Sequence, residues 1–144
     1  MADHNPRELL ERYVELMNRR AWGRLQEVLH PDYVEEYPQS GERIQGIANA
    51  VAARVEYPVS LALGDLGELV PAGADDRFTV APQHKVVQIK GTGDQYTFVL
   101  ETHYPDGSDW FIIGLAEFKD GFISRTTVFM APGFRAARLA GSFP

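Results

Sequence analysis

Residues 95–130 read QYTFVLETHYPDGSDWFIIGLAEFKDGFISRTTVFM, and this stretch decides the fold class. It holds three runs rich in β-branched and aromatic residues, which favour extended strands, at 95–104, 109–119 and 122–130. A Pro-Asp-Gly-Ser sequence separates the first two runs, and Lys-Asp-Gly separates the last two. Because Asp-Gly between two strands is typical of a tight hairpin, the stretch predicts three consecutive antiparallel strands.

The residues before this stretch predict helices. Apolar residues recur at helical spacing near the N-terminus, with charged residues between them, which indicates an amphipathic helix over 6–20. Asn5 is the expected N-cap of that helix, followed by a proline at its first position. Two further helices are expected at 22–29 and 46–55, and Pro58 is expected to close the last of them.

Weaker patterns complete the order of elements. Residues 33–37 and 77–90 are expected to form strands, 61–76 a short strand and a loose glycine-rich loop, and 135–140 a short helical tail. Three helices around one short strand, followed by antiparallel strands, predict an α+β fold with the helices on one face of a curved sheet. If the sheet curls, it leaves a cavity of the kind that small ligands prefer. A single domain over 1–144 accounts for the length.

Composition and charge restrict the partners of this chain. Fourteen Lys and Arg residues stand against twenty Asp and Glu residues, which gives a net charge of −6. This charge argues against non-specific binding to nucleic acid and to anionic membranes. The chain has no cysteine, so disulfides, thiolate nucleophiles and cysteine metal sites are excluded. No apolar run is long enough to span a bilayer and the N-terminus is polar, so we expect a cytoplasmic protein.

Alternation divides the side chains of each expected strand between two faces. In 95–104, the set that contains Phe98 and Leu100 is the more apolar one and is expected to face the helices. In 122–130 both sets contain apolar residues, so alternation does not choose between them. A sheet that is apolar on both faces indicates a second burial surface, and we therefore expect a homodimer through the outer face of the sheet.

Adjacent glutamates provide the candidate acid–base group. Glu35 and Glu36 follow one another in an expected strand and so point to opposite faces. A carboxylate that faces the helices loses hydration, which raises its pKa and suits it to general-base catalysis. An ion pair with Arg43 or Arg54 is the alternative. An inward Arg125 must likewise be paired, either with a protein carboxylate or with a ligand oxygen.

The histidines offer a further alternative. None of the four histidines has the spacing of a helical metal site. His84 and His103 lie on expected strands and could form a metal or acid–base cluster with Glu101 or Glu117. The simpler interpretation is a hydrogen-bonded polar residue on the outer face. We expect no metal and no other cofactor.

The order of elements and three sequence strings resemble the nuclear transport factor 2-like superfamily, and its SnoaL-like members in particular. The strings are YPQSGERI at 37–44, EFKDGFI at 117–123 and FMAP at 129–132. The resemblance covers nearly the whole chain and implies a cone of three N-terminal helices packed on a curved antiparallel sheet, with an internal pocket. The superfamily includes isomerases, polyketide cyclases, epoxide hydrolases, dehydratases and non-catalytic binding domains.

The resemblance also implies roles for individual residues. Tyr13 matches the helix-1 tyrosine with which ketosteroid isomerase polarises the substrate carbonyl. Tyr37 stands where that enzyme has its general-base aspartate, and its second acid is also missing, so steroid isomerisation by that route is not expected. The same comparison places on the cavity side Arg125, Thr127 and Phe129.

We therefore expect a small-molecule pocket protein, a cofactor-free cyclase, isomerase or dehydratase that acts on an apolar oxygenated metabolite. In this hypothesis Tyr13 donates a hydrogen bond and Glu36 is the leading base. Glu101 and His103 are reserve bases, and Arg125 steadies an oxyanion. The side chains expected to shape the substrate pocket are Trp22, Tyr37, Trp110, Thr127 and Phe129.

The alternative hypothesis is a non-catalytic ligand-binding or dimerisation domain. An apolar core packing role for the aromatic side chains fits this alternative. Pairing of Glu36 with Arg43 or Arg54 would weaken the enzyme hypothesis, because a paired carboxylate is a poor base.

Overall fold

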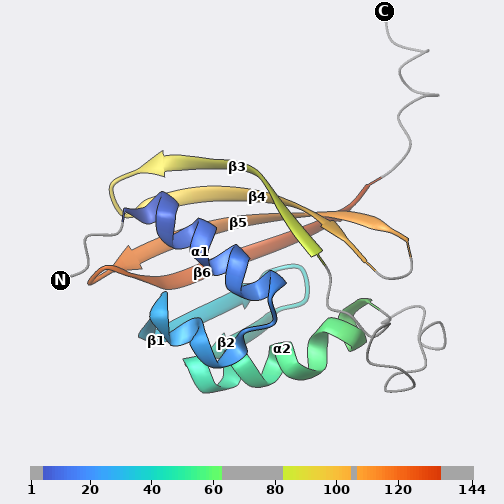
Figure 1. Cartoon of the computed structure of the whole chain (residues 1–144), viewed down its shortest axis with the longest axis horizontal. Helices are drawn as coiled ribbons and strands as arrows, with labels where there is room; N and C mark the ends of the chain where they lie inside the picture. The colour runs from blue at the N-terminus through green and yellow to red at the C-terminus, as the bar shows by residue number, and fades with distance from the viewer. Residues whose placement is uncertain (1–4, 63–82, 105–106, 134–144) are drawn as a thin grey trace, which may run out of the picture.

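The computed structural model describes residues 5–62, 83–104 and 107–133, with the side chains of 56–62 left aside. Its helices lie against one face of a six-stranded sheet (Figure 1). In chain order the elements are α1 (Pro6–Asn18), the 3-10 helix η1 (Trp22–Glu27), β1 (Leu29–Tyr37), β2 (Glu42–Gln45), α2 (Ile47–Ala62), β3 (Gln83–Thr92), β4 (Gln95–His103), β5 (Asp109–Lys119) and β6 (Phe122–Pro132).

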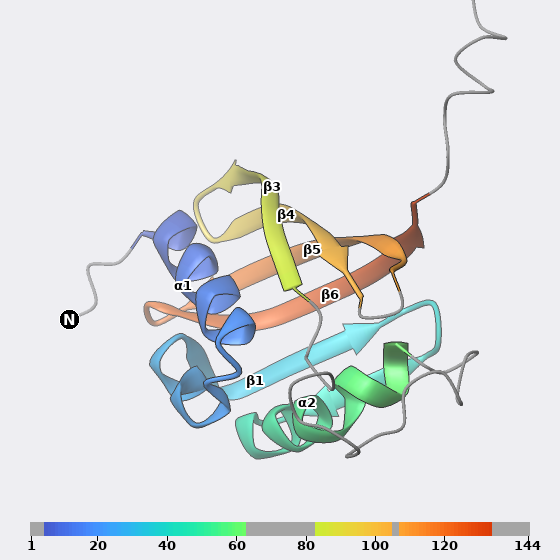
Figure 2. The ribbon, with the colours of Figure 1, turned by 45° about the vertical axis from the view of Figure 1, so that its right-hand side comes forward.

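The sheet is mixed, curved and unclosed (Figure 2). Its strand order is β2-β1-β6-β5-β4-β3, so β2 and β3 are the two edges. The expectation of a wholly antiparallel sheet is wrong at one place, because β1 runs parallel to β6. These two strands are far apart in the sequence, but they lie side by side in the sheet and run in the same direction. All other neighbouring strands are antiparallel, as expected.

Helix α1 forms as its sequence predicts. Asn5 caps it, because the Asn5 side chain accepts a hydrogen bond from the Glu8 amide at 2.8 Å, and a proline occupies the first turn. The apolar stripe of α1 is buried against the sheet and comprises Leu9, Leu10, Tyr13, Val14 and Leu16. It forms the core together with Phe98 and Leu100 of β4.

Side chains of helix α1 also form hydrogen bonds with backbone groups at the open edge of β3. The Asn18 side chain donates to the His84 carbonyl and accepts from the His84 amide, both at 2.8 Å. In the first turn of α1, Arg7 donates to the carbonyl of Ile89. An edge strand leaves backbone groups of this kind unpaired, so α1 occupies positions that a further strand would otherwise fill.

Several expected boundaries differ in the structure. The second helix is one short 3-10 helix, Trp22–Glu27, rather than an α-helix over 22–29. The third helix continues past Pro58 to Ala62, since a proline removes one intrahelical hydrogen bond and need not end the helix. Strand β2 has no counterpart in the sequence prediction. The expected tail at 135–140, the start of the strand expected at 77–90 and most of the loop at 61–76 lie outside the described residues.

The β5–β6 hairpin confirms the Asp-Gly prediction. Asp120 and Gly121 have φ angles of 55° and 80°, the left-handed values that a tight hairpin of this type requires. On β5, Gly114 lies beneath the Phe98 ring of the neighbouring strand, so closely that a Cβ at Gly114 would be 2.0 Å from Phe98 Cζ. The glycine thus makes room for a core aromatic ring.

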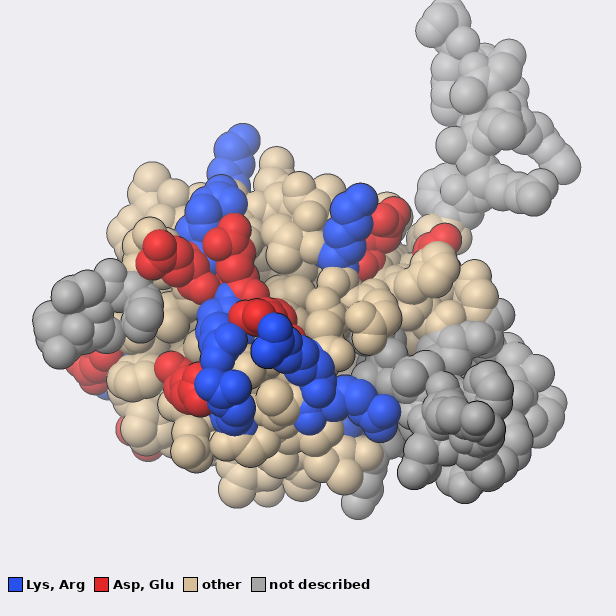
Figure 3. Space-filling model, in the orientation of Figure 1, with Lys and Arg blue, Asp and Glu red and all other residues tan. Residues whose placement is uncertain are grey.

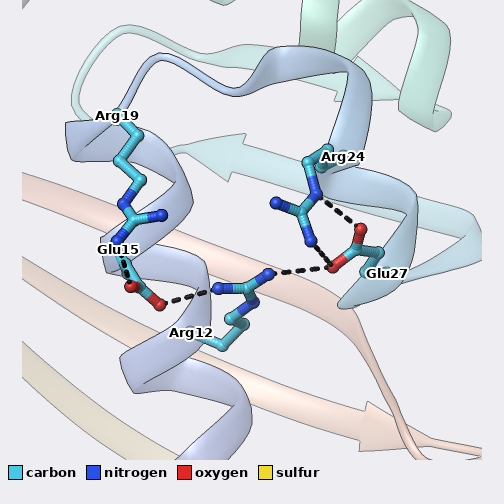
Figure 4. Close-up of polar contacts among 5 residues, drawn as sticks. All are labelled: Arg12, Glu15, Arg19, Arg24 and Glu27. Atoms are coloured by element: carbon cyan, nitrogen blue, oxygen red, sulfur yellow. Dashed lines mark hydrogen bonds and ion pairs between the residues drawn. The ribbon is translucent and has the colours of Figure 1, made fainter.

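Charged side chains of both signs gather over α1 on the surface (Figure 3). Figure 4 shows five of them in a network that joins α1 to η1. Arg12 donates to Glu15 at 2.8 Å and to Glu27 at 3.2 Å, and Arg24 donates to Glu27 at 2.7 Å. Solvent screens such pairs, so their main effect is to orient η1 against α1. Within the described ranges, no helix is long and apolar enough to cross a membrane.

Candidate functional site

A charged pair lies inside the molecule, between the sheet and the helices. Glu35 on β1 is 1% exposed and Arg54 on α2 is 7% exposed. The Arg54 Nη2 atom lies 2.6 Å from Glu35 Oε1. A buried carboxylate and a buried guanidinium each need such a partner, because leaving either charge alone in a protein interior is very costly.

Tyrosine hydroxyls complete the surroundings of this pair. Tyr33 and Tyr37 alternate with Glu35 along β1 and donate to its two carboxylate oxygens at 2.6 and 2.5 Å. The Tyr33 hydroxyl also lies 2.6 Å from the Thr126 hydroxyl on β6. From α1, the Tyr13 hydroxyl accepts a hydrogen bond from Arg54 Nη2 at 2.5 Å. We refer to the polar cluster as Tyr13, Tyr33, Glu35, Tyr37, Arg54 and Thr126.

The rest of the Arg54 guanidinium is also engaged. Its Nη1 atom donates to the Ala50 carbonyl at 3.1 Å, and its Nε atom lies 3.1 Å from the Met17 sulfur. The guanidinium carbon lies 5.8 Å from the centre of the Tyr13 ring, within range of a cation–π contact. Across the described residues, every fully buried side-chain nitrogen and oxygen has a hydrogen-bond partner.

The cluster keeps its charges and its phenolic protons. Burial by itself raises the pKa of Glu35, but the Arg54 charge and the donated hydrogen bonds outweigh burial and hold that pKa below its usual value. Burial raises the pKa of Tyr13 and, more strongly, those of Tyr33 and Tyr37. At neutral pH the site therefore presents an ionised Glu35–Arg54 pair and neutral hydroxyl groups. Such a site is better suited to donating hydrogen bonds than to accepting a proton.

The expectation that Glu36 is the inward base is wrong. Glu36 lies on the outer face of the sheet, where its carboxylate is 3.0 Å from Arg125 Nη2 and 3.8 Å from Arg43 Nε. The inward glutamate is Glu35, because it shares its face of β1 with the buried Tyr33. The pairing of Glu36 with Arg43 and Arg125 removes it from the candidate site and, as expected for a paired carboxylate, weakens the enzyme hypothesis.

The placement of Arg125, Thr127 and Phe129 on the cavity side is also wrong. A β-bulge in β6 inserts an extra residue, since Phe118 pairs with Ile123 and Glu117 pairs with Arg125. The bulge shifts the alternation by one residue, so that Thr126 and Val128 are the buried residues beyond it. The side chains on the outer face are therefore Arg125, Thr127 and Phe129.

On β4 the predicted faces are confirmed. Phe98, Leu100 and Thr102 are buried against the helices, whereas Glu101 and His103 are exposed on the other face. The His103 imidazole contacts the Asp109 carboxylate on the neighbouring strand. Neither Glu101 nor His103 contacts the polar cluster, so their expected role as reserve bases has no geometric support.

The structure also separates the two strand histidines. In the β3–β4 register His84 is opposite Thr102, and His103 is opposite Gln83, so the two imidazoles lie on opposite faces. They cannot share a metal ion. No group of three or more potential metal-ligating side chains occurs in the part of the chain that the structure describes.

Three of the expected pocket residues do lie on the helical side. Tyr37 belongs to the polar cluster, and Trp22 packs against the core. Trp110 packs edge-to-face on Tyr104, with ring centres 6.3 Å apart, and donates to the Ser108 hydroxyl at 3.2 Å. Thr126 was not expected in the site, Tyr33 was expected only as one of the aromatic side chains around a cavity or in the core, and Arg54 only as a pairing partner. The alternation of Tyr, Glu and Tyr at 33, 35 and 37 is the signal that could have identified Glu35.

Comparison with known proteins gives the class of fold. No protein-family model and no curated protein matches the sequence. Among solved structures, an NTF-2 like protein of unknown function from Burkholderia xenovorans is similar, with a TM-score of 0.72 and 22% identity over 96% of this chain and 91% of that chain. A candidate ketosteroid isomerase from Kribbella flavida has a TM-score of 0.69 and 23% identity over 94% of this chain and 87% of that chain.

A third similar structure is a candidate polyketide cyclase from Sinorhizobium meliloti. Its TM-score is 0.59 and its identity 19%, over 84% of this chain and 93% of that chain. At sequence identities this low, the similarity shows a shared fold and does not show a shared function. This chain therefore has the nuclear transport factor 2-like fold, as the resemblance of its sequence implies.

Proposed function

We propose that this protein holds a small, apolar, oxygenated metabolite between the sheet and the helices, and acts on it as a cofactor-free isomerase or cyclase. The polar cluster is the observation that supports this proposal most. A buried ion pair is weak as a source of stability, and apolar side chains of similar size often fold as well or better. Strongly perturbed ionisable groups gathered in one place are instead typical of functional sites.

The roles follow from the chemistry of each group. Tyr13 is the hydrogen-bond donor to a carbonyl or enolate oxygen, since its own oxygen already accepts from Arg54. Glu35 fixes Arg54 and takes the place that the sequence analysis gave to Glu36. A donor that is already in position stabilises charge that develops on the substrate oxygen. Tyr37, Trp22 and Trp110 are proposed to shape the pocket. Two of the similar structures, a candidate ketosteroid isomerase and a candidate polyketide cyclase, agree with this class of reaction.

The test is turnover by the wild-type protein and by Tyr13→Phe. Oxygenated steroids, polyketide intermediates and terpenoids are incubated with each protein, and products are measured by mass spectrometry. Loss of one oxyanion donor costs about 100-fold or more in rate, so Tyr13→Phe is expected to slow turnover by at least that factor. Equal turnover by both proteins would remove Tyr13 from the mechanism.

Ligand binding without catalysis is the second candidate, and one observation favours it. Glu35 is the inward carboxylate, and both of its oxygens already accept hydrogen bonds from Arg54, Tyr33 and Tyr37. A carboxylate held in this way is a poor base. In this case a ligand binds and is recovered unchanged from the complex, which the same mass spectrometry detects.

We also propose that a second copy of the chain covers the outer face of the sheet. Leu115 is 47% exposed there, and Ile113 and Phe129 are paired neighbours that are only half-buried. Light scattering is expected to give the mass of a dimer for the wild-type protein and of a monomer for Leu115→Lys. A monomeric wild-type protein would contradict this proposal without affecting the proposed pocket.

A further inference from the structure

One imidazole on the inner face of the sheet has no place in the roles described so far. His84 stands at the start of β3, opposite the fully buried Thr102 of β4. Its backbone is fixed by Asn18 of α1, which binds both the His84 amide and the His84 carbonyl at 2.8 Å. Its ring Nδ1 atom lies 2.9 Å from the Thr102 hydroxyl oxygen. Two neighbouring elements thus determine where this imidazole lies.

The contact with Thr102 decides which ring nitrogen carries the proton. A buried hydroxyl group needs an acceptor for its hydrogen. In the described part of the chain, Nδ1 of His84 is the one hydrogen-bond partner of the Thr102 hydroxyl. The hydroxyl therefore donates to Nδ1. A neutral imidazole that accepts at Nδ1 carries its hydrogen on Nε2.

The other ring nitrogen is not fully buried. Every fully buried side-chain nitrogen and oxygen among the described residues has a hydrogen-bond partner. Within those residues, the hydrogen bond of the His84 ring is the one at Nδ1. Its Nε2 atom is therefore not fully buried, although most of the side chain is. An N–H group that is fixed in position and has no hydrogen-bond partner among the described residues is available to an oxygen of a ligand.

The surroundings also keep this ring neutral. Burial, and after it the positive charge of Arg54, lower the pKa of His84 to about 4. Arg54 is the charged group of the polar cluster, so its field reaches the imidazole from the same interior. At neutral pH the ring is thus an uncharged hydrogen-bond donor rather than a cation.

We propose that His84 is a ligand-binding residue whose Nε2–H group donates a hydrogen bond to a carbonyl or enolate oxygen of the bound molecule. This inference rests on the proposed pocket and refines its ligand class. The ligand is an apolar ketone or enol, because both His84 and Tyr13 offer neutral donors to it. Thr102 and Asn18 are positioning residues that hold the ring in the required tautomer and place.

The first test needs no ligand. Long-range ¹⁵N–¹H correlation spectra of the histidine side chains distinguish a ring protonated at Nε2 from one protonated at Nδ1 and from the cation. For the wild-type protein at pH 7 we expect the His84 signals of the neutral Nε2–H form. The opposite tautomer, or an imidazolium, would overturn the inference.

The second test uses two matched probes and two matched variants. 2-Tetralone has a ketone oxygen, and tetralin has the same skeleton without it. His84→Gln places an amide near the Nε2 position, whereas His84→Asn reaches only the Nδ1 position. We expect 2-tetralone, and not tetralin, to shift the His84 Nε2–H signal of the wild-type protein. We expect its affinity to fall about tenfold in His84→Asn, as loss of one hydrogen bond does, and to stay within about threefold in His84→Gln.

The outcomes separate this inference from the proposed function. If the wild-type protein and His84→Asn bind 2-tetralone equally, the inference about His84 fails and the pocket remains. If the wild-type protein binds no ketone, the inference and the proposed pocket fail together. Thermal unfolding of both variants confirms that each is folded before affinities are compared.

Discussion

Glu35 and Arg54 form the pair on which the candidate site depends, and the effect of separating them is predictable. Arg54→Met leaves the Glu35 carboxylate buried without its counter-charge. Removing one partner of a buried pair costs about 3–5 kcal/mol, so we expect a loss of this size in the free energy of unfolding. Replacing both partners, in Glu35→Leu/Arg54→Met, is expected to recover most of that loss. Urea unfolding measures both quantities. A single variant as stable as the wild type would show that the pair is not buried as described.

The titration of His84 predicts how stability changes with pH. Its pKa in the folded protein is about 4, below its ordinary value of 6.5, so the unfolded chain binds a proton first as the pH falls. The stability that depends on the neutral ring is complete above pH 6.5 and is lost as the pH falls towards 4. The loss amounts to at most about 3 kcal/mol.

The lowered pKa of Glu35 acts in a separate window. Its contribution is present above its unfolded value near 4.5 and is lost as the pH falls further, through its lower folded pKa. Between pH 6.5 and 5, His84→Gln is therefore expected to lose less stability than the wild type. Parallel stability curves for the two proteins over that range would contradict the assignment to His84.

At the scale of the elements, the contact between β4 and β5 gives a sharp prediction. Gly114→Ala places a Cβ within 2.0 Å of Phe98 Cζ, so the ring or a strand must move. Overpacking of this kind costs about 1–3 kcal/mol. Gly23→Ala is the matched control, because a Cβ at Gly23 meets nothing within 4 Å. Thermal unfolding is expected to show a lower midpoint for Gly114→Ala and little change for Gly23→Ala. Equal midpoints would show that the ring does not rest on Gly114.

The elements also show how far the sequence could predict this molecule. The capped helix α1, the Asp-Gly hairpin and the inner face of β4 follow from local patterns, and each is confirmed. The parallel pairing of β1 with β6 is a long-range arrangement that no local pattern contains. No pattern in the sequence indicates the bulge in β6 either. The bulge nevertheless decides that the side chains on the outer face of the sheet are Arg125, Thr127 and Phe129.

For the site, the limit of prediction lies in one choice. Alternation establishes that Glu35 and Glu36 face opposite sides, but the two carboxylates themselves do not show which one faces inward. The choice depends on the tyrosine residues at 33 and 37, which share the inner face with Glu35, and on Arg54 reaching that face from α2. The tyrosine contacts lie within β1, whereas the contact with Arg54 joins two separate elements.

At the scale of the whole molecule, the helices and the sheet enclose a charged pair that folding alone does not require. A protein selected for stability alone could replace this pair with apolar side chains. Retention of the pair, with neutral donors from α1 and β1 around it, is the reason to regard the interior as a binding site. Function and stability are therefore expected to separate in variants of the cluster.

The most direct measurement of this claim is a thermal-shift screen of the wild-type protein and of Glu35→Leu/Arg54→Met. The panel contains steroids, polyketide intermediates, terpenoids and fatty acids. A ligand at 100 times its Kd adds about 2.7 kcal/mol, or roughly 5–10 °C in a domain of this size. We predict such a shift for the wild type with an oxygenated, apolar member of the panel, and none for the double variant. No shift with any of the four classes, or the same shift in both proteins, would contradict the account.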